Sequence, residues 1–171
     1  NKSCKGRIFF RFVEYFEKYK DLSKHIRFSL RNDIFKRWLL MIAKVKSAGL
    51  YGIEGYVINV EVDISQGLPS FDIVGLPDTA VRESRERVRA AIKNSGFEFP
   101  VKRITVNMAP ADTKKEGPVF DLAIAVAILM ATNQIRPLPD FDPIYIGELS
   151  LDGSIRPVRG ILPMLLSIRS Q

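Results

Sequence analysis

The sequence predicts a mixed α/β fold, an α+β domain of two layers with a sheet on one side and helices on the other. Three observations predict it. Strand-like segments, in which apolar and polar residues alternate, occur between segments of helical periodicity. Gly, Pro and Asp residues mark the boundaries between these segments. Of the 171 residues, 46% are apolar, which is enough to build the core of one domain.

The first forty residues differ in composition from the rest. Residues 1–40 hold eleven Lys and Arg against four Asp and Glu, a net charge of +7, whereas residues 41–171 hold fifteen of each. The opening segment also holds nine of the seventeen aromatic residues and the sole Cys, His and Trp of the chain. This break predicts a domain boundary near Met41.

Three interpretations of residues 1–40 remain open. The segment is a basic, aromatic-rich arm that binds nucleic acid or an anionic surface, a helical extension, or upstream sequence translated in frame with Met41 as the natural start. We favour the third, because the chain opens on Asn and the recognisable domain begins at Met41. No signal peptide or membrane-spanning stretch is predicted, and one cysteine gives no disulfide framework, so we expect a cytoplasmic protein without membrane contact.

The N-terminal part of the domain predicts three strands. Ala43–Val45 and Tyr56–Ile64 alternate apolar and polar residues around a turn that contains Gly52 and Gly55. Ser70–Val74 is a third, shorter strand bounded by Gly and Pro residues. In the second strand, four alternate residues are predicted to face the core: Ile58, Val60, Val62 and Ile64.

Thr79–Ser95 is the clearest predicted helix. Asp78 or Thr79 can cap its N-terminus, and Gly96 ends it. Four apolar residues fall on one stripe at helical spacing: Val81, Val88, Ala91 and Ile92. On the opposite side, the spacing predicts two ion pairs: Arg82 with Glu86, and Glu83 with Arg87.

The second half of the domain predicts a fourth strand and a buried helix. Lys102–Met108 is the strand, and the polar loop Ala109–Pro118 follows it. From Val119 to about Thr132 the sequence is nearly all apolar, and a helix without a polar face has to be buried on most sides.

A hairpin and a last helix close the domain. Asp152-Gly153 is a strong turn dipeptide, and it predicts strands at Ile144–Leu149 and Ser154–Val158. The last helix begins near Gly160.

Three stretches of this domain together point to a family. They are Gly67–Val88 (GLPSFDIVGLPDTAVRESRERV), Ala111–Leu129 (ADTKKEGPVFDLAIAVAIL) and Gly147–Leu165 (GELSLDGSIRPVRGILPML). In this order they closely resemble the N-terminal Lon-protease-like domain of the magnesium-chelatase-like AAA+ ATPases of the YifB and ComM group. The resemblance runs from Met41 to about Leu166. It implies a ribosomal-protein-S5-domain-2-like, Lon-proteolytic-domain-like fold, truncated at its C-terminus.

The residues that are missing exclude several kinds of chemistry. Between Met41 and Gln171 there is no His and no Cys, which excludes Ser-His-Asp and Cys-His catalysis and the usual zinc sites. No GxxxxGK(S/T) motif occurs, so nothing here binds a nucleoside triphosphate in the P-loop manner. We therefore expect no catalytic residue, cofactor or metal in this chain. ATP and Mg are expected in the AAA+ domain that the resemblance implies.

The resemblance also provides a test for a Ser-Lys dyad. In Lon-like proteases the nucleophilic serine follows a Lys-Asp-Gly-Pro turn, and its lysine lies early in the helix after the closing hairpin. The corresponding positions here are Val119, after the sequence KEGP, and Met164. We expect the fold to be retained and proteolysis to be lost. The alternative is a Lon-type peptidase with displaced residues, Ser150 or Ser154 with Lys114.

The loop before the buried helix is a candidate interaction site. Its candidate residues are Lys114, Lys115, Glu116 and Gly117. Lysines beside a Gly turn at a helix N-terminus can bind a phosphate or a carboxylate. The alternative, which we favour, is a solvated turn that sets the angle at which the helix begins. Asp121, in the first turn of that helix, is expected to interact with the helix dipole.

Four arginines of the 79–95 helix form a second candidate surface: Arg82, Arg85, Arg87 and Arg89. Such a cluster can bind nucleic acid, but Glu83 and Glu86 interleave with it, so its charge is mixed. We favour a solvated or subunit-facing surface.

The expected function is that of a non-catalytic accessory module. The resemblance implies a parent with an AAA+ domain in the same polypeptide, assembled as a homo-oligomeric, hexameric ring that hydrolyses ATP and remodels DNA. A hypothesis of a different class is a nucleic-acid-binding module that uses the basic residues 1–40.

Overall fold

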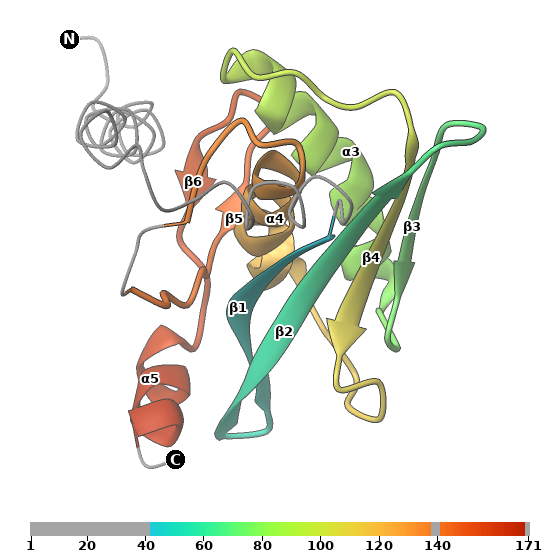
Figure 1. Cartoon of the computed structure of the whole chain (residues 1–171). Coiled ribbons are helices and arrows are strands. Elements are labelled where there is room, and N and C mark those ends of the chain that lie inside the picture. The colour runs from blue at the N-terminus through green and yellow to red at the C-terminus, as the bar shows by residue number, and fades with distance from the viewer. Residues whose placement is uncertain (1–41, 138–140, 170–171) are drawn as a thin grey trace, which may run out of the picture.

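The structure is a computed structural model that describes residues 42–137 and 141–169. The predicted extension, residues 1–40, and the predicted domain start at Met41 lie outside the described residues. Within the described part, a four-stranded sheet, three helices and a small hairpin form a mixed α/β arrangement, as predicted (Figure 1). None of the helices in that part is both long enough and apolar enough to span a bilayer.

The central sheet has the strand order β1-β2-β4-β3. β1 (Ile42–Tyr51) pairs antiparallel with β2 (Glu54–Ser65), which pairs antiparallel with β4 (Arg103–Ala109). β3 (Ser70–Val74) pairs parallel with β4 and forms an edge of the sheet. The predicted third and fourth strands are confirmed to within one residue. A parallel pair needs a crossover connection, which the helix between β3 and β4 provides.

The two faces of the sheet differ as the alternation in β2 predicted. Its four predicted core residues are at most 3% exposed: Ile58, Val60, Val62 and Ile64. On the other face Asp63 is exposed, and Glu61 accepts a hydrogen bond from Asn107 at 2.9 Å and lies 3.6 Å from Lys44. One face therefore belongs to the core, and the other is polar.

Two helices lie against the apolar face of the sheet (Figure 1). α3 (Thr79–Asn94) is confirmed to within one residue, and its predicted apolar stripe is buried. The predicted buried helix is α4 (Asp121–Ala131), which begins two residues late because Pro118–Phe120 form a 3-10 turn, η2. Ten of the eleven residues of α4 are buried.

The closing hairpin is much shorter than predicted. β5 (Glu148–Leu149) pairs with β6 (Ile155–Arg156) over two residues each. Ile144 and Tyr145, expected in the hairpin, pair with β1 instead, where the Tyr145 amide donates to the Lys46 carbonyl at 2.9 Å, and Gly147 bonds to Val119 and Leu122. Because this segment pairs with β1, it is not available to pair with the second hairpin strand.

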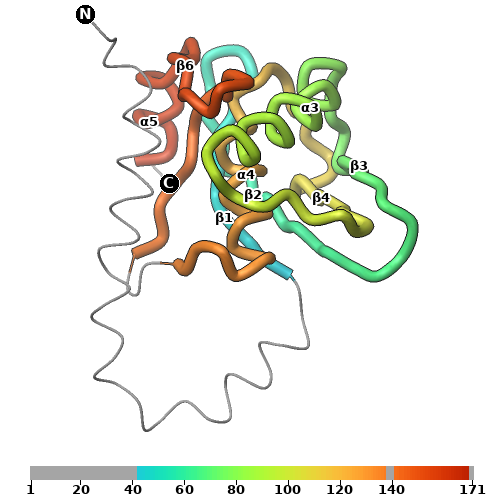
Figure 2. Tube along the Cα trace, turned by 90° about the horizontal axis from the view of Figure 1, so that it is seen from above, coloured from blue at the N-terminus to red at the C-terminus, as the bar shows by residue number. Residues whose placement is uncertain are grey.

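α5 (Ile161–Arg169) begins where it was predicted and packs against the β1–β2 hairpin. Gly55 was expected in the turn of that hairpin but lies in β2. A Cβ atom on Gly55 would lie 2.6 Å from the Cα atom of Met164, so the close approach of α5 requires glycine there. The hairpin β5–β6 and α5 lie at one end of the molecule and β3 at the other (Figures 1 and 2).

Candidate functional site

The loop between β4 and η2 is fixed to the start of α3. The amide of Lys115 donates to the Leu76 carbonyl at 3.2 Å, and its carbonyl accepts from the Asp78 amide at 3.0 Å. The Asp78 carboxylate accepts from the amide of Val81 at 2.7 Å and from the amide of Gly117 at 3.0 Å. One side chain thus caps α3, as predicted, and also holds the turn that leads into η2.

Lys115, the second lysine of this loop, is fully buried. Its Nζ donates a hydrogen bond to the Pro110 carbonyl, and burial lowers the pKa of the ammonium group. The favoured interpretation, a solvated turn, is therefore wrong for this lysine, because its side chain packs inward. Its ammonium group also does not reach the surface, where an anion would meet it.

Lys114 and Glu116 are exposed charges of the same loop. The Lys114 Nζ lies 2.7 Å from a Glu116 carboxylate oxygen, and this hydrogen bond raises the pKa of Lys114. Their side chains are 64% and 58% exposed, so for these two residues the favoured interpretation of a solvated turn agrees with the structure. Gly117 has a φ of 80°, a left-handed conformation that favours glycine at the turn.

Asp121 is bound by Arg87 across the contact of α3 with α4. Nε and Nη2 of Arg87 donate to the two carboxylate oxygens at 2.7 and 3.0 Å, and the Leu149 amide donates to the same carboxylate at 3.2 Å. Arg87 also donates to the Ala80 carbonyl at 2.9 Å. Burial raises the pKa of the Asp121 carboxyl, and the Arg87 guanidinium opposes that shift. Three elements are therefore joined by one buried ion pair.

This pair corrects two predictions. Asp121 does lie in the first turn of α4, but the helix dipole is not its main partner. Arg87 was expected to pair with Glu83, and instead it reaches Asp121. An exposed pair at four-residue spacing contributes only about 0.2–0.5 kcal/mol, so a bidentate, charge-assisted contact inside the protein prevails. The other predicted pair, Arg82 with Glu86, is also absent from the described residues.

The two positions that the Lon resemblance implied are both buried. Val119, in η2, is 6% exposed, and Met164, in α5, is 3% exposed. Neither side chain carries a hydroxyl or an amine, so the dyad cannot form at these positions. Within residues 42–137 and 141–169, no group of three or more His, Cys, Asp or Glu side chains could hold a metal ion.

The displaced dyad is not assembled either. Ser154 Oγ donates to the Asp152 carboxylate at 2.8 Å, and Ser150 lies across the same turn. The Asn94 side chain, at the C-terminal end of α3, donates to this turn at 2.6 Å. Lys114 lies in the loop that is fixed to the N-terminal end of α3. Sixteen helical residues span about 24 Å, so the hydroxyls and the Lys114 ammonium group lie far apart.

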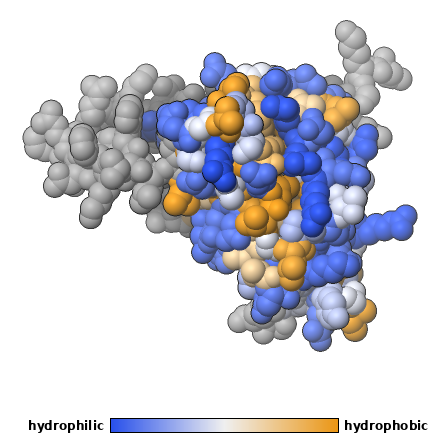
Figure 3. Space-filling view, turned by 90° about the vertical axis from the view of Figure 1, so that its right-hand side faces the viewer, coloured by the Kyte–Doolittle hydropathy of each residue, from blue (hydrophilic) through white to orange (hydrophobic). Residues whose placement is uncertain are grey.

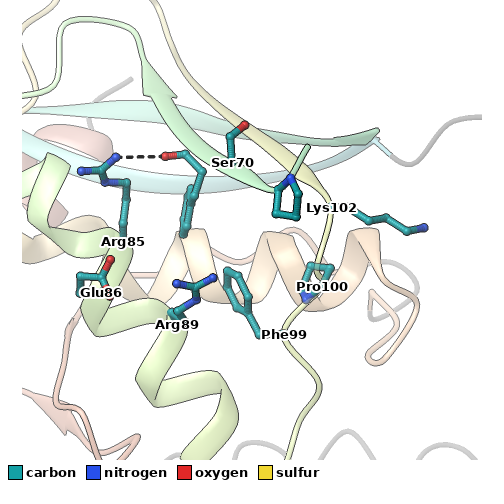
Figure 4. A pocket seen from close by; sticks show the side chains of 9 residues that line it. Ser70, Arg85, Glu86, Arg89, Phe99, Pro100 and Lys102 are labelled. Atoms are coloured by element: carbon teal, nitrogen blue, oxygen red, sulfur yellow. Dashed lines mark hydrogen bonds between the residues drawn. The ribbon is translucent and has the colours of Figure 1, made fainter. Parts of the chain in front are cut away.

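Two arginines of α3 contact β3 and the segment that precedes β4, so they do not extend only into solvent. Arg85 donates from Nε to the Arg82 carbonyl at 3.1 Å and from Nη1 to the Phe71 carbonyl at 3.3 Å. The Arg89 guanidinium lies 5.3 Å from the centre of the Phe99 ring. Both arginines line a pocket beside β3 (Figure 4). Sequence reasoning missed this pocket because it recognised the arginines but not the aromatic residues that fold against them.

Comparison with known proteins identifies the family of this domain. Residues 60–171 match the family described as subunit ChlI of Mg-chelatase. The chain belongs to this family. The match begins within β2 and includes every later element, the loop at Lys115 and the buried positions Val119 and Met164.

Three curated relatives of this ChlI-family chain confirm the resemblance to the YifB and ComM group. The chain is 43% identical over 130 residues to competence protein ComM of Haemophilus influenzae and 46% identical over 125 residues to the uncharacterized protein YifB of Escherichia coli. It is 43% identical over 131 residues to an uncharacterized protein of Mycobacterium tuberculosis. These matches cover 75%, 72% and 76% of this chain, and 25%, 24% and 26% of the relatives. The chain thus spans about a quarter of the length of these relatives.

Proposed function

We propose that residues 41–171 form a non-catalytic accessory domain of a longer, magnesium-chelatase-like AAA+ ATPase. The domain keeps a ribosomal-protein-S5-domain-2-like, Lon-proteolytic-domain-like fold without the protease chemistry. The parent uses ATP and Mg in an AAA+ domain of the same polypeptide, assembles as a hexameric ring and remodels DNA. Two findings support this parent: the relatives are about four times longer than the matched domain, and one of them is named a competence protein.

One observation carries the non-catalytic role. The positions where a Lon-type serine and lysine would meet hold Val119 and Met164, and both are buried in the core. Nearby polar groups are already bound inside the protein, since Asp121 pairs with Arg87 and the Lys115 ammonium group donates to a carbonyl. These two groups stabilise the fold, so neither is available for acid–base or nucleophilic chemistry.

A surface of α5 supports the accessory role. Four of its large apolar residues are 40–67% exposed: Ile161, Leu162, Leu165 and Leu166. An exposed apolar surface of this kind is typical of a contact with another domain. We assign this surface as the contact with the ATPase part of the same polypeptide. The domain would then be docked onto the motor through α5.

The missing chemistry is tested with a fluorophosphonate probe that labels activated serines. The full chain and an active serine protease, as the positive control, are incubated with the probe and analysed by mass spectrometry. We expect label on the control and none on the chain. A labelled serine anywhere in the chain would contradict the non-catalytic role.

The attachment is tested by co-expressing the chain with the remaining part of its parent. The variant Leu162→Glu, Leu166→Glu is expected to weaken the association by at least tenfold, because burying two charges at an apolar contact is costly. Leu68→Glu is the matched control, since Leu68 is 89% exposed and lies in the loop before β3, away from α5. If the α5 variant associates as tightly as the control, the assignment of this surface is wrong.

A further inference from the structure

β3 is an edge strand with a pocket beside it. Within the described residues its one neighbouring strand is β4, so the other edge of β3 has no strand partner there. Such an edge presents backbone N–H and C=O groups with which a further strand can pair. The pocket, of about 220 Å³, lies between the start of β3, the middle of α3 and the segment that enters β4 (Figure 4). Nothing in the proposed accessory role accounts for either feature.

The Phe71 carbonyl shows which backbone groups of β3 face outward. It accepts a hydrogen bond from Nη1 of Arg85, a side chain of α3, at 3.3 Å (Figure 4). The N–H and C=O of one strand residue point to the same side, and the side alternates along the strand. The backbone groups of Phe71 and Ile73 therefore face away from β4. The Arg85 guanidinium thus occupies the place of the amide that a further strand would donate, and its bond is longer than the usual distance of about 2.9–3.0 Å.

The charges around the pocket nearly cancel. Arg85 and Arg89 line it together with the Glu86 carboxylate. On β3, the Asp72 carboxylate accepts a hydrogen bond at 3.0 Å from the hydroxyl of a serine that lines the pocket. Lys102 also lines the pocket, but its side chain points away from both arginines (Figure 4). Charge therefore selects no anion here, and a ligand has to be recognised through its backbone and its apolar groups.

The pocket has an apolar part that is large enough for a side chain. Its apolar lining residues are Pro69, Phe71, Phe99 and Pro100. The two Phe rings lie 5.9 Å apart, and the Arg89 guanidinium lies 5.3 Å from the centre of the Phe99 ring. Pockets that hold drug-sized ligands have volumes of about 300–1,000 Å³, and this pocket is smaller. It therefore suits one inserted apolar side chain better than a whole cofactor.

The surface around β3 is also apolar in part. Figure 3 shows this end of the molecule, where charged side chains flank an apolar band. Leu68, Val74 and Leu76, which precede, end and follow β3, are 89%, 46% and 56% exposed. An exposed apolar surface of this kind marks a contact with another molecule. A strand edge, an apolar band and a side-chain pocket are together what a peptide requires to bind as an added strand.

We infer that the groove between β3 and α3 binds an extended peptide of a partner protein. The peptide pairs with the outer edge of β3 and inserts an aliphatic or aromatic side chain into the pocket. A peptide amide replaces Arg85 at the Phe71 carbonyl, and the peptide backbone also pairs with Ile73. Main-chain hydrogen bonds then provide affinity, and the pocket provides specificity. The inference is independent of the accessory role and of the α5 surface, because β3 lies at the other end of the molecule (Figures 1 and 2).

Two other occupants of this edge are less suitable. A second copy of the chain that paired antiparallel about the middle of β3 would place Asp72 opposite Asp72, and like charges in that position are destabilising. The basic residues 1–40, with a net charge of +7, gain no counter-charge at a pocket whose charges nearly cancel. Either occupant would protect the edge of β3 in the absence of any peptide, so both can be recognised by measurement.

The test follows hydrogen exchange of backbone amides in the full chain by NMR, with and without peptide. The probe is an equimolar pool of capped seven-residue peptides in which Thr alternates with Leu, Val or Phe. Without peptide, the amides of Phe71 and Ile73 should exchange freely. The pool should slow their exchange by at least roughly tenfold in a saturable manner, because these amides gain acceptors on the added strand. The β4 amides serve as the internal reference.

Glu86→Trp tests the pocket, because it places a large ring at the pocket wall. It should weaken binding of the peptide pool by roughly tenfold, since the inserted side chain loses its place. Glu83→Trp is the matched control. It makes the same change of charge and size at an exposed position of the same helix that does not line the pocket, and it should leave binding within about twofold. Equal weakening in both variants would contradict insertion into the pocket.

Ile73→Pro tests the strand edge, because proline lacks the N–H and is tolerated in a strand where that N–H faces away from the ladder. Ile73→Ala is its matched control, since it also loses the side-chain contacts but keeps the N–H. The pool should bind Ile73→Pro about fivefold more weakly than Ile73→Ala, which corresponds to one hydrogen bond. Thermal melts establish that both variants are folded, and the Glu86 and Glu83 variants test the groove without any change in β3.

Arg85→Gln distinguishes strand addition from recognition of an anion. It removes the guanidinium that competes for the Phe71 carbonyl, so the pool should bind at least as tightly as to the unmodified chain. The inference is overturned if Arg85→Gln weakens binding as much as Glu86→Trp does, or if the pool does not slow exchange in β3. It is also overturned if the amides of Phe71 and Ile73 are already protected without peptide, which would assign the edge to a second copy or to another segment of this chain.

Discussion

α4 and α5 are both rich in apolar residues but lie in opposite environments. In α4, ten of eleven residues are buried, whereas in α5 Met164 alone is buried among nine. α4 packs against β1 and β2 and beside α3, and α5 lies at the edge of the molecule, mainly against the β1–β2 hairpin (Figure 1). The difference shows that an apolar helix sequence predicts a need for a partner, while the neighbouring elements decide whether this chain supplies it.

The largest expected effect concerns the ion pair that joins α4 to α3. Arg87→Ala should lower the free energy of unfolding by about 4 kcal/mol, because it leaves the buried Asp121 carboxylate without its main partner. Urea denaturation of the full chain measures the loss. Arg82→Ala, an exposed change on the same helix, should stay within about 0.5 kcal/mol. Equal losses in the two variants would show that the pair does not hold α4 in place.

The direct comparison of the two helices comes next. Ile128→Ala in α4 should cost about 3 kcal/mol, because Ile128 is fully buried and its removal leaves a cavity. Leu162→Ala in α5 should cost about 0.5 kcal/mol or less, because Leu162 is 67% exposed. Both values come from denaturant titrations of the full chain. A cost for Leu162→Ala close to that of Ile128→Ala would mean that the chain itself covers the outer face of α5.

A smaller effect is expected where α5 touches the sheet. In Gly55→Ala the new methyl group would overlap the backbone of Met164, so α5 must shift, at a cost of about 2 kcal/mol. Hydrogen exchange should then become faster in α5 and stay unchanged in α4. Glu54→Ala, at the exposed neighbouring position, is the control. Unchanged exchange in α5 would show that its contact with β2 is looser than the structure indicates.

The smallest effect is a pH dependence at the loop that precedes α4. Burial places the pKa of Lys115 in the folded chain below its ordinary value of 10.5, so the unfolded chain binds more protons between these two pKa values. Stability must therefore rise with pH across that window. We expect the unmodified chain to gain stability relative to Lys115→Met as the pH approaches 10.5, as measured by denaturation at several pH values.

Lys114 gives the opposite sign and serves as the control for this pH dependence. Its pKa in the folded chain is raised by the hydrogen bond with Glu116. Its contribution is therefore present below the ordinary pKa and is lost as the pH rises through the raised value. If Lys114→Met and Lys115→Met change the pH profile of stability in the same way, the burial of Lys115 does not control its proton.

The sequence predicted much of the fold because strands, helices and caps depend on near neighbours. Period-two alternation located β2 and its buried face, and Asp78 was one of the two caps predicted from their place at the start of α3. The buried positions of the absent dyad, Val119 and Met164, followed from the family resemblance. The hairpin was overestimated, because residues 144–147 alternate like a hairpin strand, while Ile144 and Tyr145 pair with β1 instead.

The site could not be predicted in the same way. Arg87 has Glu83 one turn away, yet it binds Asp121, thirty-four positions along the chain. Lys115 stands in a polar loop and resembles a surface lysine, and only the fold shows that its side chain packs inward. Charge and spacing along the sequence do not reveal which distant carboxylate or carbonyl the tertiary structure brings into reach.

By itself the sequence determined which segments are strands and helices, which of their faces are apolar, and which family the chain resembles. These features depend on residue spacing and on side-chain type, and both can be read along the chain. The tertiary structure decided the partners: that α4 is enclosed and α5 is not, that Asp121 is neutralised by Arg87, and that Arg85 and Arg89 lie against Phe71 and Phe99. Such partnerships depend on distances across the packed core, and a linear pattern does not contain them.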